Sequence, residues 1–337
     1  MTGRPVVFAT RELPGAPWEL VRAVAELRVW EGEDAPPREV LLREVERAEG
    51  LIVAFVDRVD AELLGAAPRL RVVSTCSVGV DHVDLAAASA RGIAVGHTPG
   101  VLTEATADLA FALLLAAARR IPEADRFVRA GRWLKAWEPD LLLGKELAGA
   151  TLGVVGLGAI GEAVARRAQG FGMRVLGWSR SGRGVPGVTA VGDLGELLAA
   201  ADFVSVHVAR TPQTLGLIAA REIARMKRGA ILVNTARGGI VDEAAVCAAL
   251  ASGQLSAAAL DVFETEPLPA SSPLLAAPNL VLAPHLGSAT YATRARMSEL
   301  CVKNLVAGLR GEKMPRCANA ELLAARASGA SRPLLAR

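Results

Sequence analysis

The stretch Leu152-Gly153-Val154-Val155-Gly156-Leu157-Gly158-Ala159-Ile160-Gly161 decides the fold, because it sets three glycines between an apolar strand and a helix. Gly156 permits a tight turn, Gly158 lets the backbone approach a pyrophosphate, and Gly161 lets the helix pack close to the strand. The helix N-terminus offers free N–H groups and a positive dipole end to phosphates. The pattern predicts a dinucleotide site; the alternative is a strand-to-helix turn without a ligand.

On both sides of this turn, short apolar runs alternate with helical stretches rich in Ala, Leu, Glu and Arg. This alternation is typical of βαβ units and a parallel sheet. Before the turn we expect strands at 6–10, 50–54, 71–75 and 93–96, and helices at 17–27, 38–47 and 103–120, the last followed by Pro122. From the turn onward we expect strands at 151–155, 173–178, 203–207, 230–234, 257–261 and 280–283, and a helix at 289–309.

We therefore predict two α/β domains, one inserted in the other. The inserted domain spans 104–285, the discontinuous domain consists of 1–103 and 286–325, and a loosely ordered tail covers 326–337. A chain of 337 residues suits two domains of ordinary size. With 52% hydrophobic residues, two buried cores are expected.

Composition narrows the class of protein. The net charge of +3 is spread along the chain without long runs of like charge, so we expect no nucleic-acid partner. The four cysteines (76, 247, 301 and 317) lack zinc-ligand spacing, so we predict free thiols and no metal. The N-terminus lacks the apolar core of a signal peptide, and the most apolar run, 109–118, is about half a membrane span. We expect a cytoplasmic protein without a membrane partner.

The end of the second strand of the inserted domain selects the cofactor. An NAD site places Asp or Glu there to bind the ribose 2′-hydroxyl. This chain has Trp178-Ser179-Arg180-Ser181. Ser179 and Arg180 can bind and neutralise a 2′-phosphate, which a carboxylate would repel. We predict NADPH/NADP+ as the cofactor, with weaker use of NADH; the alternative is that Arg180 is an ordinary solvated residue.

Three further segments, at 233–239, 261–268 and 284–290, follow the carboxyl ends of expected strands, where ligands bind in open α/β sheets. The fork of Arg237 can span a carboxylate and an adjacent carbonyl. His285 can donate a proton, because an imidazole exchanges its proton near neutral pH. Glu266 can keep that imidazole charged. Each residue alone is weak evidence, but their joint placement predicts reduction of a 2-oxoacid.

The glycine turn, Asn234-Thr235-Ala236-Arg237-Gly238, the segment from Asp261 to Glu266-Pro267 and Pro284-His285-Leu286-Gly287-Ser288 together resemble the D-2-hydroxyacid dehydrogenase family. The resemblance covers about residues 5–315. Segments 74–82, 98–103 and 309–315, with Trp133 and Trp137, are most similar to glyoxylate reductase/hydroxypyruvate reductase. The resemblance implies a Rossmann cofactor domain inserted in a flavodoxin-like substrate domain, both doubly wound, with an interdomain cleft.

The resemblance also implies residue roles. Arg237 would bind the substrate carboxylate and carbonyl, Glu266 and His285 would form the acid/base pair, and Asp261 would contact the nicotinamide carboxamide. The amides of Val78 and Gly79 would bind the substrate carboxylate, which suits a loop that can act as an anion nest; the alternative is a plain loop after a strand. Further implied contacts are Ser288 with substrate, and Ala159, Ile160, Ser181, Ala209, Thr235 and Gly287 with cofactor.

A homodimer is implied too. Trp137 matches a tryptophan that, in similar reductases, enters the neighbouring subunit's site; the alternative is an interdomain packing residue. The helix at 103–120 is apolar on more than one face, and in the family it helps to form the dimer. Burial between domains would explain that helix equally well.

The expected reaction is NADPH-dependent reduction of hydroxypyruvate to D-glycerate and of glyoxylate to glycolate, with His285 as proton donor. There are three alternatives. Phosphoglycerate dehydrogenase typically uses NAD and often carries an added regulatory domain. Formate dehydrogenase carries Gln in the place of Glu266. A corepressor-like protein would bind the dinucleotide as a signal, but usually has an acidic ribose-binding residue where this chain has Ser179.

Overall fold

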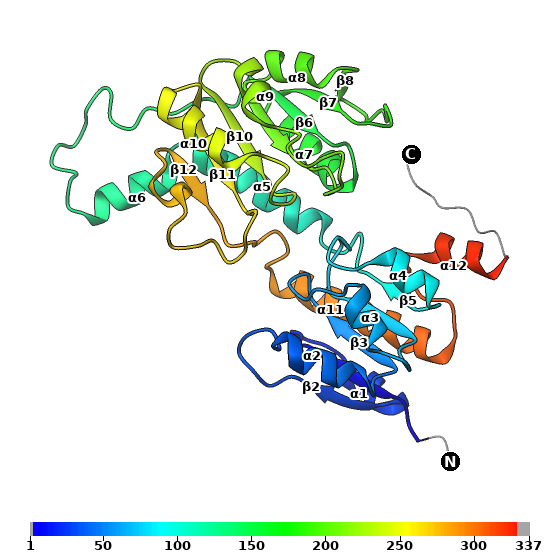
Figure 1. The fold of residues 1–337 in the computed structure, drawn as a ribbon. Helices are drawn as coiled ribbons and strands as arrows, with labels where there is room; N and C mark the ends of the chain where they lie inside the picture. Colours follow the sequence, from blue (N-terminus) through cyan, green and yellow to red (C-terminus); the bar gives the residue numbers. More distant parts are fainter. Residues whose placement is uncertain (1–2, 329–337) are drawn as a thin grey trace. The chain divides into compact units, whose positions relative to one another are not determined.

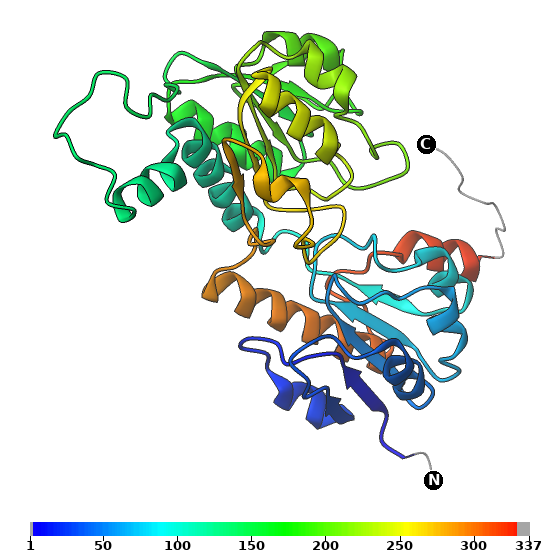
Figure 2. The ribbon, with the colours of Figure 1, turned by 60° about the vertical axis from the view of Figure 1, so that its left-hand side comes forward.

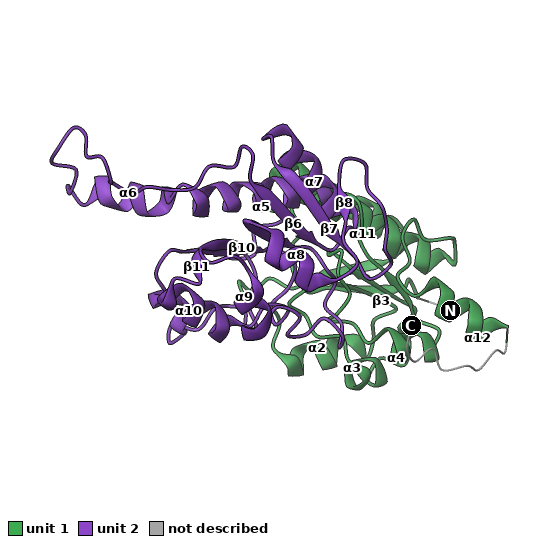
Figure 3. Ribbon diagram, turned by 90° about the horizontal axis from the view of Figure 1, so that it is seen from above, with its two compact units in different colours: residues 1–102, 289–337 green, residues 103–288 purple. Residues whose placement is uncertain are grey.

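The computed structural model describes residues 3–328, which form two compact units (Figure 3). Unit 1 contains the residues up to 102 and those from 289 onward, and unit 2 contains residues 103–288. Each unit has its own parallel sheet and its own hydrophobic cores. The predicted fold class, with two parallel-sheet α/β domains and one inserted in the other, is confirmed.

Unit 1 has a five-stranded sheet in the order β2-β1-β3-β4-β5, and all its strand pairs are parallel. This is the flavodoxin-like order, which reverses between β1 and β3. Its elements are β1 (Val6–Ala9), α1 (Trp18–Val24), β2 (Glu26–Val29), α2 (Arg38–Val45), β3 (Gly50–Val53), α3 (Ala61–Gly65), β4 (Val72–Thr75), α4 (Leu85–Ala90), β5 (Ala94–Gly96), α11 (Tyr291–Arg310) and α12 (Ala320–Ala327).

Helices enclose both faces of this sheet. β3 and β4 are buried at every position, as parallel strands between two helical layers are. α1 and α11 share one core, to which Trp18 and Leu305 contribute, while α2, α3 and α4 pack on the other face. Figures 1 and 2 show α11, which returns to unit 1 after unit 2, lying along the sheet. The last part of the chain thus completes the first unit.

Unit 2 has a seven-stranded parallel sheet in the order β12-β11-β10-β9-β6-β7-β8. This is the Rossmann order extended by one strand, and it reverses between β6 and β9. Its elements are α5 (Thr103–Ala118), α6 (Ile121–Arg129), β6 (Thr151–Val155), α7 (Ala159–Gly170), β7 (Arg174–Trp178), β8 (Thr189–Ala190), α8 (Leu194–Ala200), β9 (Phe203–Val206), α9 (Ala220–Arg225), β10 (Ala230–Asn234), α10 (Glu243–Ser252), β11 (Leu255–Leu260), a short 3-10 helix (Pro273–Ala276) and β12 (Leu280–Leu282).

The strand register of unit 2 brings the chemistry-bearing segments to one edge. Val155 lies opposite Trp178 and Val206, so β6, β7 and β9 end together. Asn234 lies opposite Val206 and Leu260, which brings the ends of β10 and β11 to the same edge. α5 and α7 pack on one face, and α8, α9 and α10 on the other. The glycine turn and the three segments that carry the catalytic candidates therefore all begin at the same edge of the sheet.

One helix prediction in unit 1 is wrong at its end. The helix expected over 17–27 stops at Val24, and Glu26–Val29 forms the edge strand β2 beside β1. Glu26 and Arg28 are exposed while Leu27 and Val29 are half-buried, which is the two-residue period of a strand. Four residues are too few for that period to stand out beside a helical run.

A second correction concerns the helix expected over 103–120. α5 ends at Ala118, and Arg120 takes a left-handed φ of 54°. Pro122 then lies in the first turn of α6, where its missing N–H is not needed. Figure 3 shows α6 and the segment after it extending away from the sheet of unit 2. Pro122 was expected to follow the end of a helix, and it also lies at the start of a second one.

At the C-terminus, α12 continues to Ala327, into the stretch expected to be a tail. The rest of that stretch, from residue 329, lies outside the described residues. Among residues 3–328, no helix combines the length and apolar character needed to cross a membrane.

Candidate active site

The glycine turn lies where the strand order of unit 2 reverses. Gly156 has a φ of 103°, and a Cβ there would lie 2.7 Å from the carbonyl of His207. A Cβ on Gly161 would lie 1.9 Å from the carbonyl oxygen of Gly156, so α7 approaches the turn this closely only with glycine. Gly158 has nothing within 4 Å of its Cβ position. The backbone beside Gly158 is thus open to a ligand, as the pyrophosphate role requires.

The start of α7 fits a bound phosphate. Gly158 is the N-cap residue of this twelve-residue helix and supplies no side-chain cap. The first N–H groups and the positive dipole end therefore face the open space beside exposed Ala159 and half-buried Ile160. At the same edge of the sheet, Thr235 follows β10, and its buried Oγ1 has no hydrogen-bond partner among the described residues. The residues present fit a dinucleotide.

The loop after β7 is rich in hydroxyl groups and arginine. Ser179 is half-buried, and Arg180 and Ser181 are exposed. The Ser179 hydroxyl accepts the amide of Arg183 at 3.0 Å, and the Arg183 guanidinium lies 2.7 Å from the carboxylate of Glu162 in α7. Sequence reasoning missed Arg183, although a second arginine three residues after Arg180 was a visible signal. Glu162 thus forms an ion pair between α7 and Arg183 of this loop.

The segment after β9 begins with His207, whose carbonyl lies against Gly156 of the glycine turn, and it carries no charge there. His207 contacts the Ser205 hydroxyl through Nε2 at 2.8 Å. Desolvation lowers the pKa of His207 to about 4, so its ring is neutral at physiological pH. Ala209, two residues on, is exposed.

The segment that carries Arg237 is fixed by side-chain and backbone contacts. Asn234, at the end of β10, accepts the amide of Ala236 at 3.0 Å and donates to the carbonyl of Arg237 at 3.0 Å. A Cβ on Gly238 would lie 1.8 Å from the carbonyl oxygen of Phe263. Glycine at this position therefore lets the Arg237 segment pack directly on the segment that leads to Glu266. Arg237 itself is half-buried.

His285 and Glu266 form a hydrogen-bonded pair. His285 Nδ1 lies 2.7 Å from Glu266 Oε2, and Glu266 Oε1 accepts the amide of Phe263 at 3.0 Å. Burial acts to raise the pKa of Glu266, but the bonds from His285 and Phe263 and the charges of His285 and Arg237 outweigh it and lower that pKa. His285 has a left-handed φ of 55°, a costly conformation for a non-glycine residue. Glu266 is thus an ionised acceptor that holds the proton on Nδ1.

Asp261 secures the turn that carries His285. It is fully buried after β11, and its two oxygens accept the amides of Leu286 at 2.6 Å and Gly287 at 2.9 Å. Its carbonyl accepts the amide of His285 at 2.9 Å. Burial raises the pKa of Asp261 to about 6, because its effect outweighs the lowering by these N–H groups and by His285. Asp261 therefore orients the whole 285–287 turn, a role that sequence reasoning did not assign to it.

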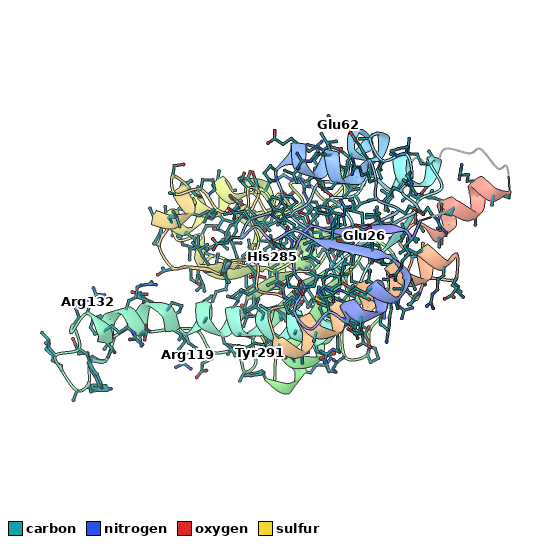
Figure 4. All side chains as sticks on the ribbon, turned by 90° about the horizontal axis from the view of Figure 1, so that it is seen from below. Glu26, Glu62, Arg119, Arg132, His285 and Tyr291 are labelled. Atoms are coloured by element: carbon teal, nitrogen blue, oxygen red, sulfur yellow. The ribbon has the colours of Figure 1, made fainter. Side chains whose placement is uncertain are left out.

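The remaining predicted site residues are spread over both units. Gly287 is buried and its carbonyl accepts the hydroxyl of Thr106 at 2.9 Å, and Ser288 is half-buried. Trp137 is 77% exposed. Figure 4 shows Arg132, on the segment beyond α6, far along unit 2 from His285. Val78 and Gly79 belong to unit 1, in the loop after β4. Among the described residues no cluster of His, Cys, Asp and Glu could hold a metal ion.

Known proteins resemble the chain over nearly its whole length. Residues 111–287 match the family described as D-isomer specific 2-hydroxyacid dehydrogenase, NAD binding domain. A glyoxylate reductase of Korarchaeum cryptofilum (strain OPF8) is 47% identical over 333 residues, covering 97% of this chain and 99% of the relative. The chain belongs to the D-2-hydroxyacid dehydrogenase family. As a member of this family, it is an oxidoreductase that uses a nicotinamide dinucleotide.

Solved structures are similar to this D-2-hydroxyacid dehydrogenase over most of its length. A protein from Thermus thermophilus superposes with a TM-score of 0.88 at 51% identity, covering 93% of this chain and 99% of that one. The NADPH-dependent glyoxylate/hydroxypyruvate reductase from Sinorhizobium meliloti, in complex with NADP and malonate, has a TM-score of 0.84 at 35% identity, covering 95% and 98%. The family resemblance drawn from the motifs is confirmed.

Proposed function

We propose that this dehydrogenase reduces short 2-oxoacids with NADPH, converting hydroxypyruvate to D-glycerate and glyoxylate to glycolate. The observation that carries the proposal is the 2.7 Å contact between His285 and Glu266, close to Arg237 on the edge that holds the glycine turn. The names of the relatives, glyoxylate reductase and glyoxylate/hydroxypyruvate reductase, support the substrate class.

His285 is the proposed proton donor. Glu266 can only accept at the 2.7 Å contact, so Nδ1 carries the proton there and Nε2 exchanges the proton with the substrate oxygen. The ionised Glu266 stabilises the charged ring and fixes its direction. General acid catalysis of this kind contributes about 10²- to 10⁴-fold to the rate.

Arg237 is the proposed substrate clamp. Its planar guanidinium can bind the substrate carboxylate and polarise the adjacent carbonyl, which a lysine ammonium cannot do with the same fork geometry. The amides of Val78 and Gly79 would bind the same carboxylate as an anion nest, with Ser288 as a further substrate contact.

When bound, the nicotinamide supplies the hydride that reduces C2 of the 2-oxoacid. The turn from Gly156 to Gly161 would hold the pyrophosphate, and Asp261 the carboxamide; Ala159, Ile160, Ala209, Thr235 and Gly287 are the other proposed cofactor contacts. Ser179, Arg180 and Ser181 would bind the 2′-phosphate. Arg183 adds a second guanidinium to this loop, which supports NADPH over NADH.

The test is steady-state oxidation of NADPH and NADH in parallel, with hydroxypyruvate, glyoxylate, pyruvate and phosphohydroxypyruvate. We expect fast NADPH turnover with the first two. Preference for phosphohydroxypyruvate with NADH would favour the phosphoglycerate-type alternative. Tight cofactor binding without turnover of any substrate would favour the corepressor-like alternative.

The cofactor preference can be tested against a matched control, an arginine at the other end of the strand that precedes Arg180. Arg180→Asp should lower kcat/KM for NADPH by about 10- to 100-fold, because a charged hydrogen-bonding partner of the 2′-phosphate is lost and a repulsive charge is added. The exposed Arg174 lies at the opposite end of β7, and Arg174→Asp should change neither cofactor's kcat/KM. Equal weakening of NADPH and NADH by Arg180→Asp would contradict the assignment.

We also propose that the protein is a homodimer in which Trp137 enters the neighbouring subunit's site. No residue of α6 is buried, and the segment 121–137 exposes Ile121, Val128, Trp133, Leu134 and Trp137, each by more than half of its surface. An apolar surface of this extent supports an interface between protein chains.

A further inference from the structure

The loop that follows β4 has all three of its central carbonyl groups held by hydrogen bonds. The carbonyl of Ser77 accepts the amide of Thr98 at 2.8 Å. The carbonyl of Val78 lies 3.1 Å from His97 Nδ1, and the carbonyl of Gly79 accepts the Ser77 hydroxyl at 2.6 Å. The three peptide planes from 77 to 80 are therefore fixed one by one.

This arrangement sets the direction of the loop amides. In a trans peptide the N–H points opposite to the C=O of the same plane, so the carbonyls of Ser77, Val78 and Gly79 turn the N–H groups of the following residues away from the protein contacts. Among the described residues, no hydrogen bond from the amides of Val78, Gly79 or Val80 is found. All three residues are half-buried, so part of each remains exposed to solvent. Three neighbouring donors are thus presented together.

His97 is itself anchored from the C-terminal part of unit 1. A carbonyl only accepts, so His97 Nδ1 carries the proton that it donates to Val78. The carbonyl of His97 accepts the side-chain amide of Asn304 at 2.8 Å, and the fully buried Asn304 also accepts the amide of Arg316 at 2.9 Å. The amide of His97 donates to the carbonyl of Arg316 at 3.3 Å. α11 and the segment after it thereby fix the backbone that aims the ring.

The second support is a directed chain of hydrogen bonds. Ser77 uses its only hydroxyl proton on the carbonyl of Gly79, so the 2.8 Å contact between the Thr75 and Ser77 hydroxyls needs the proton of Thr75. The 2.9 Å contact between Thr75 and His82 Nε2 then needs the proton of His82. The order is His82 to Thr75 to Ser77 to Gly79, and Thr75 and Ser77 are buried. Such a chain resists rotation of the Gly79 peptide.

We propose that His97 and Ser77 are positioning residues for substrate binding, which hold the carbonyls of Val78 and Gly79 so that the loop amides face the carboxylate of the 2-oxoacid. The inference rests on the proposed function, in which the amides of Val78 and Gly79 bind that carboxylate. Because the Gly79 carbonyl that Ser77 holds shares its peptide plane with the N–H of Val80, the inference adds the amide of Val80 to these two donors. The simpler alternative is that both residues only stabilise unit 1. The positioning role predicts a higher KM for the substrate, whereas a purely stabilising role predicts a lower Tm with an unchanged KM.

The test compares four variants of the full-length enzyme. His97→Leu and Ser77→Ala each remove one donor to a loop carbonyl, while His97→Asn keeps a side-chain amide donor at a similar reach. Ser89→Ala is the matched control, because the Ser89 hydroxyl also donates from a buried position to a carbonyl, that of Leu85, within α4. Each variant is measured for Tm, for KM and kcat with hydroxypyruvate, for Kd of NADPH, and by calorimetry for Kd of oxalate, a dicarboxylate that cannot be reduced.

We expect His97→Leu and Ser77→Ala to raise KM and the oxalate Kd by about 3- to 10-fold each, the effect of one lost hydrogen bond, with kcat within about twofold. The NADPH Kd should stay unchanged. His97→Asn should restore most of the loss, and Ser89→Ala should lower Tm alone. A fall in Tm with unchanged KM in the loop variants, or a wild-type protein that does not bind oxalate, would overturn the inference. If the wild-type protein reduces no 2-oxoacid but binds oxalate through this loop, the proposed reaction fails and the positioning role stands.

Discussion

At the scale of single residues, the role of a side chain depends more on its hydrogen-bond partners than on its residue type. Glu264 and Glu266 are two positions apart, yet Glu264 is exposed whereas Glu266 accepts from His285 and from the amide of Phe263. The difference comes from the path of the chain past Gly238, where the absence of a Cβ lets two loops meet.

Glu266→Gln should therefore lower kcat by at least roughly 10²-fold, because a neutral amide no longer favours the charged ring of His285. Glu264→Gln, the matched control, should keep kcat within about twofold. Steady-state kinetics with saturating NADPH checks both, together with the NADPH Kd, which should be the same in all three proteins. Equal losses in the two variants would show that Glu266 has no special role.

Asp261 predicts a pH dependence. Because burial raises its pKa to about 6, the carboxylate takes up a proton as the pH falls through that value. The ordinary pKa of an aspartate is about 3.9, so between those two values the folded state binds more protons than the unfolded chain and stability from this group falls as the pH rises. Activity should instead rise with pH over this range. A protonated oxygen of Asp261 accepts the amide of Leu286 or Gly287 less well, and this loosens the turn that carries His285.

We expect kcat to decline below about pH 6 for the wild-type protein, with the loosening of the turn adding to the titration of the other groups. Asp261→Asn can accept from only one of the two amides at any pH, so its kcat should be at least about 10-fold lower and should lack the Asp261 part of that decline. The profiles of kcat between about pH 5 and 8 decide the matter. An Asn variant with the wild-type rate and profile would rule out the orienting role.

At the scale of elements, the glycine turn separates ligand binding from folding. A Cβ at Gly161 would lie 1.9 Å from a backbone oxygen, whereas a Cβ at Gly158 meets nothing within 4 Å. Gly161→Ala should thus cost about 1–3 kcal/mol of stability through overpacking. Gly158→Ala should leave Tm near the wild-type value but weaken NADPH binding, because the methyl group occupies the space beside the helix N-terminus. Thermal unfolding and cofactor titration test the pair; a Gly158→Ala protein that binds NADPH normally would place the pyrophosphate elsewhere.

The sequence predicts elements well where their period is long or their turn chemistry is strict. The strand, turn and helix from 151 to 170 are foreseeable from apolar residues and three glycines. The two-residue strand β8 and the edge strand β2 are not, because their pairing with β7 and β1 determines them more than their own residues do. The same holds for the ion pair between Arg183 and Glu162, which depends on the path of a loop with no repeating pattern.

At the scale of the whole molecule, the chain order explains what a sequence can and cannot convey. The strand order within each sheet follows from the alternation of strands and helices and from the family motifs, but the contact of Asn304 with residue 97 spans 207 positions. No local pattern indicates such a contact. α11 can complete unit 1 only because unit 2 returns the chain to it, so the supports of the Val78-Gly79 loop come from both ends of the sequence.

The largest prediction concerns assembly. If the segment 121–137 forms the interface of a homodimer, Leu134→Glu should give monomers, because a charge replaces an apolar side chain that is 86% exposed in the single chain. Tyr291, which is 99% exposed at the start of α11, provides the control, and Tyr291→Glu should leave the mass unchanged. Light scattering coupled to size-exclusion chromatography gives the mass of each protein. Since Trp137 belongs to the same segment, the monomeric variant should also show a raised KM for hydroxypyruvate with an unchanged NADPH Kd. A wild-type protein that is monomeric and fully active would refute both the dimer and the role of Trp137 in a neighbouring site.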